Sequence, residues 1–287
     1  MARIGWLGGL TVWLGLLSGC AVPAPFRVMS FNIRTADAND GVNAWPLRRS
    51  VLIAAIQAHA PDIIGLQEVL ASQGDELRAA LPDYGFVGVG RDDGQQTGEF
   101  VPILYRRQRF TLLETGHFWL SDRPTQPGSV GWDAALPRMA TWARLRCNDA
   151  PWREIHVVNT HFDHRGAQAR LESARLLRRL VESLGGQPTI LLGDFNCPPG
   201  SPPYRVLTAK RGDLAELSEV HAAAGNVGTY HAFTGQPDVG RIDWILVNRR
   251  FQVVTTDIDR TRRDGRYPSD HFPVVAEISF VTGSGGG

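Results

Sequence analysis

The sequence predicts an α/β fold in which two mixed β-sheets pack face to face, with helices on their outer faces. Short apolar runs rich in Val, Ile, Phe and Trp, bounded by Gly, Pro, Asp or Asn, recur along the chain and indicate strands. Other segments show the apolar periodicity of helices. Strand and helix alternate at first, and a run of strands, a helix and further strands follow. Such a mixture of α/β units and antiparallel meanders is typical of packed sheets.

The elements can be placed in chain order. Helical periodicity covers residues 47–60, 72–81 and 167–184, with Ser72 as the expected N-cap of the second helix. The strand-like runs occupy residues 26–33, 62–69, 84–90, 100–107, 110–120, 139–147, 153–162, 188–196, 241–248, 251–258 and 273–280.

A long loop interrupts the run of strands at residues 121–138. Loops of this length inside a compact domain are usually functional or disordered, and Trp132 and Leu136 argue against disorder. We therefore expect this loop to form the rim of a cleft.

The first residues have the pattern of a secretory signal. One Arg, an apolar run and small residues precede Cys20, and the run is too short for a comfortable membrane span. The end of this segment resembles the bacterial lipobox, which implies that residues 1–19 are a lipoprotein signal peptide and that Cys20 is lipidated. Its residues are Leu17, Ser18, Gly19 and Cys20.

This resemblance implies a location. More than one acyl chain on Cys20 would anchor the protein stably to a membrane. Ala21 after the Cys suggests the outer membrane of a bacterial cell envelope, facing the periplasm or the exterior. Residues 20–25 then form the lipidated Cys and a tether, residues 26–281 the folded domain, and residues 282–287 a flexible tail.

Charge and cysteine usage limit the other partners. The formal net charge is only +1, so no global field recruits a polyanion such as nucleic acid. Beyond Cys20 the chain holds Cys147 and Cys197, which could make at most one disulfide. We expect none, because Cys147 falls in a hairpin away from Cys197. We also expect a monomer.

Polar residues recur where the apolar runs end or begin. The free-energy cost of desolvating a polar side chain in that position must be offset by a partner, a metal or a substrate. There are more such residues here than turns and helix caps alone would require. In "GDFN", a period-two strand would send the Asp and the Asn to the same face. The residues are Asn32, Glu68, His161, Asp194, Asn196, Asp243, Asp270 and His271.

These residue types suit metal-assisted hydrolysis of a phosphate ester. Glu68, with Asn32 and Asp270 beside it, offers hard oxygen ligands for Mg²⁺, with Mn²⁺ as the other candidate. His271 could take a proton from the attacking water while Asp243 orients its imidazole.

Three further residues could act at the phosphate. His161 could donate a hydrogen bond to a phosphoryl oxygen, and Asp194 and Asn196 could align the water and the phosphate.

The motifs that carry these residues resemble the signatures of the endonuclease/exonuclease/phosphatase family, the deoxyribonuclease-I-like superfamily. They occur in the family's order and span essentially the whole of residues 26–281. The motifs are "SFNIR", "LQEV", "NTHFDH", "GDFN", "RIDWILV" and "SDHFPV". The resemblance implies a four-layer α/β sandwich, a Mg²⁺ or Mn²⁺ requirement, and the roles given above. It further implies that Tyr105 in "ILYRR" reaches the phosphate.

Weaker signals mark residues that could bind substrate. Arg138 and Arg165 could hold a phosphate, although surface pairing is the commoner fate of a lone Arg. His164 could line the cleft, although a solvated loop would equally explain it. Arg260, Arg262, Arg263 and Arg266 precede the last motif and could hold a polyanion or a lipid headgroup, but two Asp residues interrupt them.

The sequence leaves several functions open. We expect a magnesium-dependent hydrolase of phosphate esters, with a phosphodiesterase favoured. The alternatives are an extracellular or periplasmic nuclease, a phospholipid or sphingomyelin-type phosphodiesterase, and an envelope binding module without turnover. A nuclease would need a basic groove, which the near-neutral charge does not favour, and fold alone does not determine substrate.

Overall fold

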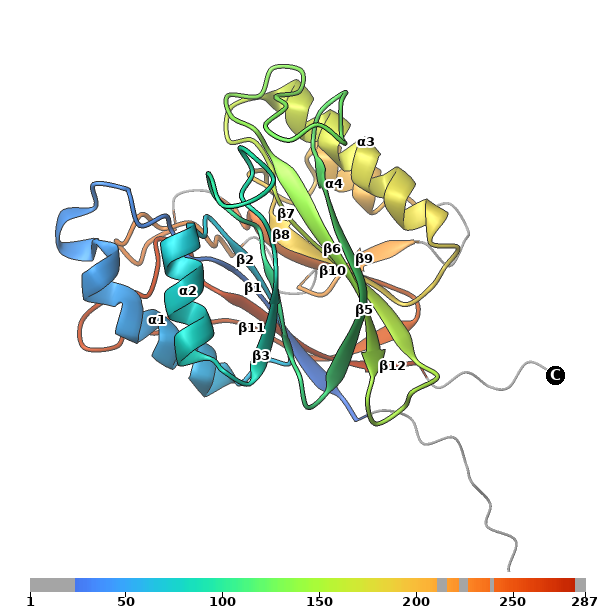
Figure 1. Ribbon diagram of the computed structural model, residues 1–287, viewed down its shortest axis with the longest axis horizontal. Coiled ribbons are helices and arrows are strands. Elements are labelled where there is room, and N and C mark those ends of the chain that lie inside the picture. Colours follow the sequence, from blue (N-terminus) through green and yellow to red (C-terminus); the bar gives the residue numbers. More distant parts are fainter. Residues whose placement is uncertain (1–23, 211–215, 222–226, 238–239, 282–287) are drawn as a thin grey trace, which may run out of the picture.

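Two six-stranded β-sheets pack face to face at the centre of the fold (Figure 1). The computed structural model describes residues 24–210, 216–221, 227–237 and 240–281. Helices cover the outer face of each sheet, so the layers run helix, sheet, sheet, helix. This arrangement confirms the fold class expected from the sequence. The predicted signal peptide, Cys20 and the tail at 282–287 lie outside the described residues.

The first sheet brings several chain segments to one edge. β1 and β2 are parallel, with Asn32 paired to Gln67, so both strands end at the same edge. β12 runs antiparallel to β1 and therefore begins at that edge. The order is β11-β12-β1-β2-β4-β3, with bounds β1 Phe26–Asn32, β2 Ile63–Gln67, β3 Tyr84–Val87, β4 Ile103–Arg106, β11 Phe251–Ile258 and β12 Val274–Phe280.

The second sheet repeats this arrangement. β7 and β8 are parallel, and His161 pairs with Asp194 at their carboxyl ends. β10 runs antiparallel to β8, which places its first residue, Asp243, opposite Asp194. The order is β5-β6-β7-β8-β10-β9, with bounds β5 Phe110–Trp119, β6 Met139–Cys147, β7 Glu154–His161, β8 Thr189–Asp194, β9 Leu217–Glu219 and β10 Asp243–Asn248.

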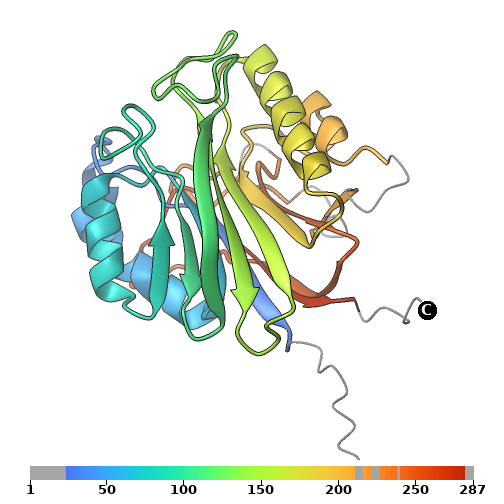
Figure 2. The ribbon, with the colours of Figure 1, turned by 45° about the vertical axis from the view of Figure 1, so that its right-hand side comes forward.

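Helices complete the outer layers (Figure 2). α1 (Trp45–His59), preceded by the short helix η1 (Gly41–Asn43), and α2 (Ala71–Ala80) pack on the first sheet, whereas α3 (Ala167–Ser183) and α4 (Pro202–Leu207) pack on the second. None of the helices in the described ranges is long and apolar enough to cross a membrane.

One local prediction was wrong. α2 begins at Ala71 rather than after Ser72, and the amide of Leu70 donates to Oε1 of Gln73 at 3.0 Å. Ser72 therefore lies inside the first turn. The expectation for the thiols is confirmed, because Cys147 and Cys197 are both free and buried.

The two sheets approach closely at Gly65 of β2. A Cβ atom at this position would lie 1.8 Å from Cδ1 of Leu192 on β8 and 2.7 Å from Oδ1 of Asn159 on β7. Only a residue without a side chain therefore fits between the sheets here. Apolar residues of both sheets, among them Val28 and Ile245, fill the rest of the space between them.

We predict that Gly65→Ala destabilises the fold by about 1–3 kcal/mol, because the added methyl group overpacks the space between the sheets. Leu192→Ala should cost about 2–5 kcal/mol through the cavity it leaves. The double variant should cost less than the sum, since the new methyl group would occupy the vacated space. Chemical denaturation of the four proteins measures this coupling, and strict additivity would contradict the close approach.

Candidate active site

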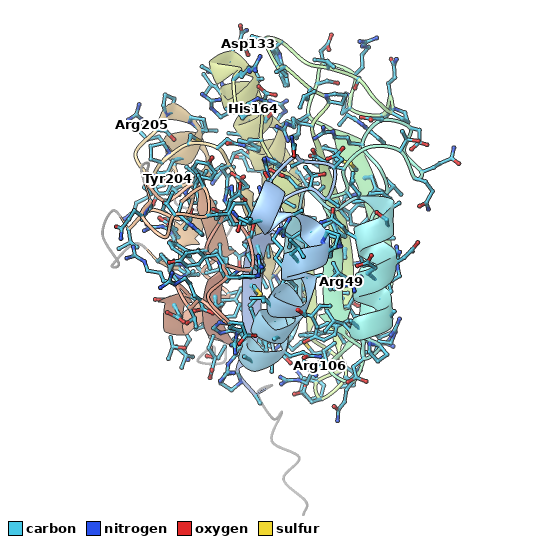
Figure 3. All side chains as sticks on the ribbon, turned by 90° about the vertical axis from the view of Figure 1, so that its left-hand side faces the viewer. Arg49, Arg106, Asp133, His164, Tyr204 and Arg205 are labelled. Carbon is cyan, nitrogen blue, oxygen red and sulfur yellow. The ribbon has the colours of Figure 1, made fainter. Side chains whose placement is uncertain are left out.

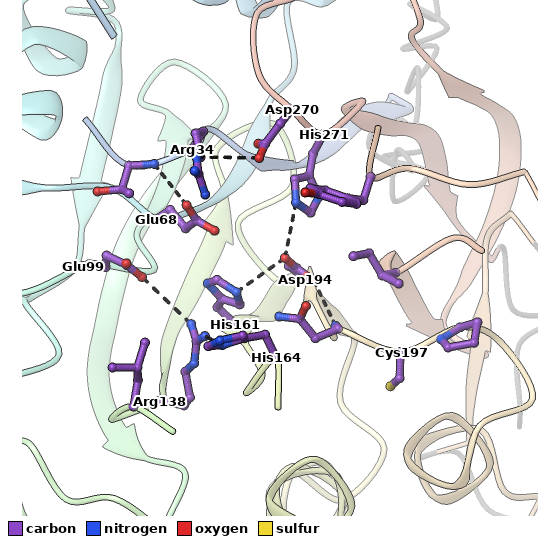
Figure 4. Close-up of a pocket in the computed structure, with 16 residues that line it drawn as sticks. Arg34, Glu68, Glu99, Arg138, His161, His164, Asp194, Cys197, Asp270 and His271 are labelled. Atoms are coloured by element: carbon purple, nitrogen blue, oxygen red, sulfur yellow. Dashed lines mark hydrogen bonds and ion pairs between the residues drawn. The ribbon is translucent and has the colours of Figure 1, made fainter. Parts of the chain in front are cut away.

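A cleft of about 520 Å³ opens at the edge where the parallel strands of both sheets end (Figure 4). Each sheet contributes side chains to it, as the topology requires. The predicted residues that line it are Glu68, Arg138, His161, His164, Asp194, Asn196, Asp270 and His271. The long loop at 121–138 contributes Leu136 and Arg138 to the wall, in agreement with the expected rim.

Asn32 connects the two sheets beneath the cleft. Its Nδ2 donates to Oε1 of Glu68 and to Oδ2 of Asp194, at 3.0 Å each. Its Oδ1 accepts from the backbone amide of Arg34 at 3.0 Å, and the residue is fully buried. Both polar atoms are thus engaged within the protein. The structure places Asn32 as the support of two carboxylates, behind the surface on which a ligand would bind.

Glu68 and Asp270 present carboxylates to one side of the cleft. Oε2 of Glu68 accepts from the amide of Thr35 at 3.1 Å, and Asp270 accepts from the hydroxyl of Ser269 at 3.2 Å. Nε of Arg34 lies 3.7 Å from Asp270. Burial, together with the nearby charge of Glu68, raises the pKa of Asp270. Hard oxygen donors that repel one another fit a divalent cation, which would relieve the repulsion.

His271, which follows Asp270 in the chain (Figure 4), forms a buried pair with Asp243. Nδ1 of His271 lies 2.9 Å from Oδ2 of Asp243, and its other nitrogen, Nε2, lies 3.9 Å from Asp194. Burial opposes the charged imidazole, but the carboxylate of Asp243 and its hydrogen bond outweigh burial and raise the pKa of His271. The pair leaves Nε2 directed toward the cleft, in the arrangement of a general base with its orienting acid.

Asp194 lies between the imidazoles of His161 and His271. Its Oδ2 is 3.5 Å from Nε2 of His161, and its Oδ1 accepts from the amide of Asn196 at 2.9 Å. Burial, with the charge of Asp243, raises the pKa of Asp194. Burial, with the charge of Arg138, lowers the pKa of His161, so this histidine is neutral at pH 7 and can donate one hydrogen bond.

Carboxylate and imidazole atoms of Asp194, Asp243 and His271 also lie within 4.8 Å of one another, close enough to share an ion. A cation at this position would have to displace the hydrogen bond between His271 and Asp243. A cation between Glu68 and Asp270 would leave that hydrogen bond in place.

Three residues of the cleft hold the backbone in the left-handed region. The φ angles are 57° at Arg34, 61° at Glu68 and 50° at Asn196, values that non-glycine residues adopt rarely and at a cost. Nδ2 of Asn196 donates to the carbonyl of Phe162 at 3.0 Å, which holds the turn in place. The strand ends are therefore bent to direct these side chains into the cleft.

Asn32 and Asp243 lie just behind the lining and contact residues that form it, whereas two other predicted residues lie away from the site. Tyr105 pairs with Ile63 at the start of β2, so it lies at the opposite end of that strand from Glu68, and its ring packs over Gly85. The next residue, Arg106, correspondingly lies far from His164 (Figure 3). The assignment of Tyr105 to the phosphate was wrong. Arg165 is exposed and outside the lining, and its backbone amide donates to Asp163.

Other lining residues escaped the sequence analysis. Arg34 is the last residue of the "SFNIR" motif and Thr35 follows it, shortly after the end of β1, but no pattern distinguished their side chains. Glu99 lies in the loop between β3 and β4, and Tyr230 lies in an irregular segment where its ring contacts that of His271, with centroids 5.1 Å apart. Only tertiary structure brings these loop residues to the site.

Comparisons with known proteins agree with this geometry. The sequence model of the Endonuclease/Exonuclease/phosphatase family matches residues 29–271. A crystal structure of a family protein from Bacteroides thetaiotaomicron is 36% identical, with a TM-score of 0.83 over 90% of this chain and 98% of that one. A mannosyl-6-phosphatase from the same species is 37% identical, with a TM-score of 0.81 over 89% of this chain and 100% of that one.

More distant relatives are longer proteins. Mouse nocturnin is 23% identical over 90% of this chain and 66% of its own length. A mimivirus protein is 27% identical over 61% of this chain and 30% of its own length. The chain thus spans less than two thirds of these relatives.

We predict that Asn196→Gly and Asn196→Ala both disturb the site but differ in stability. Both lose the side-chain hydrogen bond to Phe162, whereas only Ala must hold a Cβ atom in the left-handed region, at a cost of about 1–2 kcal/mol. Denaturant unfolding should therefore show the Gly variant to be more stable than the Ala variant. Equal stabilities would argue against backbone strain at this turn.

Proposed function

Because the chain belongs to the endonuclease/exonuclease/phosphatase family, whose members are phosphoester hydrolases, we propose that it is a divalent-metal-dependent hydrolase of phosphate esters. The observation that carries the proposal is the buried pair of His271 and Asp243, 2.9 Å apart, in the cleft that Asp194, Glu68 and Asp270 also line. A base, a water-aligning carboxylate and a metal site thus line one cleft.

The reaction follows from these positions. Burial opposes the charged imidazole, but the charge of Asp243 outweighs burial and raises the pKa of His271 to about 10, so only the neutral fraction of His271, which grows as the pH rises, acts as the base. In that fraction Nε2 takes the proton of a water molecule that Asp194 aligns, and Asp243 stabilises the resulting imidazolium.

The water attacks phosphorus, the bond from phosphorus to the ester oxygen breaks, and the leaving oxygen takes a proton from solvent to depart as an alcohol. His161 and the second hydrogen on Nδ2 of Asn196, whose first hydrogen bonds to Phe162, donate hydrogen bonds to phosphoryl oxygens that gain charge in the transition state.

Glu68 and Asp270 would hold a divalent ion, Mg²⁺ or Mn²⁺, which when bound neutralises developing charge on the phosphate and its leaving oxygen. Asn32 keeps Glu68 and Asp194 in position through its two hydrogen bonds.

The cleft favours a small substrate over nucleic acid. Its volume of about 520 Å³ falls in the range of small-molecule sites. A nucleic-acid backbone is held mainly by basic side chains, and the near-neutral net charge of +1 does not favour such a partner. The 37% identical mannosyl-6-phosphatase supports a phosphomonoester, which moves our preference away from the diester expected from the sequence.

A membrane anchor at Cys20 is part of this proposal. Ala24 and Phe26 lie at the start of β1, and Asn32 beneath the cleft at its end, so the anchored end would face away from the substrate site. A seven-residue strand is roughly 20 Å long. This placement argues that the substrate is not a lipid of the membrane in which the protein is anchored. We propose a location at the outer membrane of a bacterial envelope.

We predict metal-dependent hydrolysis of p-nitrophenyl phosphate by the full chain, abolished by EDTA and restored by Mg²⁺ or Mn²⁺. His271→Ala should lower kcat at least about 100-fold, because the general base is removed. His156→Ala, at the far end of β7 from His161, is the matched control and should retain activity.

Bis-p-nitrophenyl phosphate, plasmid DNA, RNA and sphingomyelin, assayed in parallel, distinguish the alternatives. Faster turnover of a diester than of the monoester would overturn the phosphatase preference. Metal binding with no turnover of any ester would favour the binding module instead.

Cys20→Ser should move the protein from the membrane fraction to the soluble fraction of a Gram-negative host. The change removes the thiol that would carry the diacylglycerol, so incorporation of labelled palmitate should be lost as well. Equal partitioning of the two proteins would contradict the lipid anchor.

A further inference from the structure

A second group of polar side chains lies in the same cleft, beyond the residues that act on phosphorus. Glu99 and Arg138 lie across the cleft from His271, with His161 and Asp194 between them (Figure 4). Nη1 of Arg138 is 4.0 Å from Oε2 of Glu99, and Nη2 is 3.1 Å from Nδ1 of His164. The mechanism proposed above uses none of these three residues.

The surrounding structure holds this group rigidly. The side chain of Arg138 is only 5% exposed, and its Nε lies 3.6 Å from Asp163 but has no hydrogen-bond partner in the described part of the chain. Arg91 forms an ion pair with Glu99. Asp163 in turn accepts from the amide of Ala135, which attaches the rim loop to the end of β7.

The rim loop is attached a second time, to α3. The carboxylate of Asp133 accepts from the amides of Gln168 and Ala169, at 3.2 and 2.6 Å. Preorganised donors and an acceptor of this kind lose little entropy when they bind a ligand.

The charges in this group select the ligand. The carboxylate of Glu99 would repel any phosphate beyond the one that is hydrolysed. Glu99 and Arg138 together are therefore unsuited to binding a polyanion. A carboxylate next to a guanidinium and an imidazole instead offers both acceptors and donors, the combination that vicinal hydroxyl groups require.

The direction of the reaction places the leaving group here. The water that His271 activates attacks phosphorus roughly in line with the leaving oxygen. The alcohol therefore departs on the side away from His271, toward Glu99 and Arg138.

We propose that Glu99, Arg138 and His164 form a subsite for the hydroxyl groups of the leaving alcohol, so that the substrate is the phosphate ester of a sugar or another polyol. This inference rests on the proposed function and deepens it. Glu99 accepts hydrogen bonds from substrate hydroxyls, and Arg138 and His164 donate to their oxygens.

Comparing substrates with and without hydroxyl groups tests the subsite. Glu99→Gln in the full chain should lower kcat/KM for hexose 6-phosphates at least 10 times more than for p-nitrophenyl phosphate. Glu114→Gln, which removes an exposed partner of Arg144 outside the cleft, is the matched control and should leave the ratio unchanged. A thermal melt of each variant checks that the fold is retained.

A series of deoxy hexose 6-phosphates, assayed on the wild type and on Glu99→Gln, measures the coupling between each substrate hydroxyl and Glu99. Removing the relevant hydroxyl should cost the wild type at least 10-fold in kcat/KM and cost Glu99→Gln much less, because the partner is already altered. Equal losses in both proteins, or an unchanged substrate ratio in Glu99→Gln, would overturn the subsite while leaving phosphatase activity intact.

If no phosphate ester is hydrolysed by the wild type, the proposed function fails separately. Calorimetric binding of hexose 6-phosphates would then still test the subsite. Weaker binding to Glu99→Gln than to Glu114→Gln would support it, and equal binding would refute it.

Discussion

The amide of Asn32 is the contact on which the site depends. It comes from the first sheet and holds Glu68, which follows β2, and Asp194, which ends β8 in the second sheet. Two carboxylates of different sheets are thereby kept at fixed positions without an added charge. The contact requires the sheets to meet closely, and Gly65 permits this because a side chain would collide with Leu192. The packing between the sheets therefore also determines the geometry of the cleft.

The site concentrates groups that are costly to bury. Asp194, Asp243, Asp270 and His271 are each at most 5% exposed, and three neighbouring residues hold left-handed backbone conformations. Such a cost is compensated by the rest of the fold, here by large apolar clusters on both faces of each sheet. At these positions local sequence preference and global structure disagree, as is common where a fold carries chemistry.

The sequence predicted the residues that parallel strands deliver to one edge. Asn32, Glu68, His161 and Asp194 each follow an apolar run, and the direction of the strands brings them together. The prediction for Tyr105 was wrong because the sequence does not reveal how β4 pairs with β2. That pairing places Tyr105 beside the start of β2, away from the site. Glu99 could not be found, since a loop between β3 and β4 carries it across the cleft.

A layer of neutral amides lies just below the charged residues. Nε2 of Gln67 donates to Oδ1 of Asn159 at 2.7 Å, and Nδ2 of Asn159 donates to the carbonyls of Leu66 and Pro102 at 2.7 and 2.8 Å. These groups do not titrate in the range where proteins work. The junction between the sheets consequently keeps its shape while the carboxylates and imidazoles above it change charge. Acidity can thus alter catalysis in this protein without loosening the scaffold that carries it.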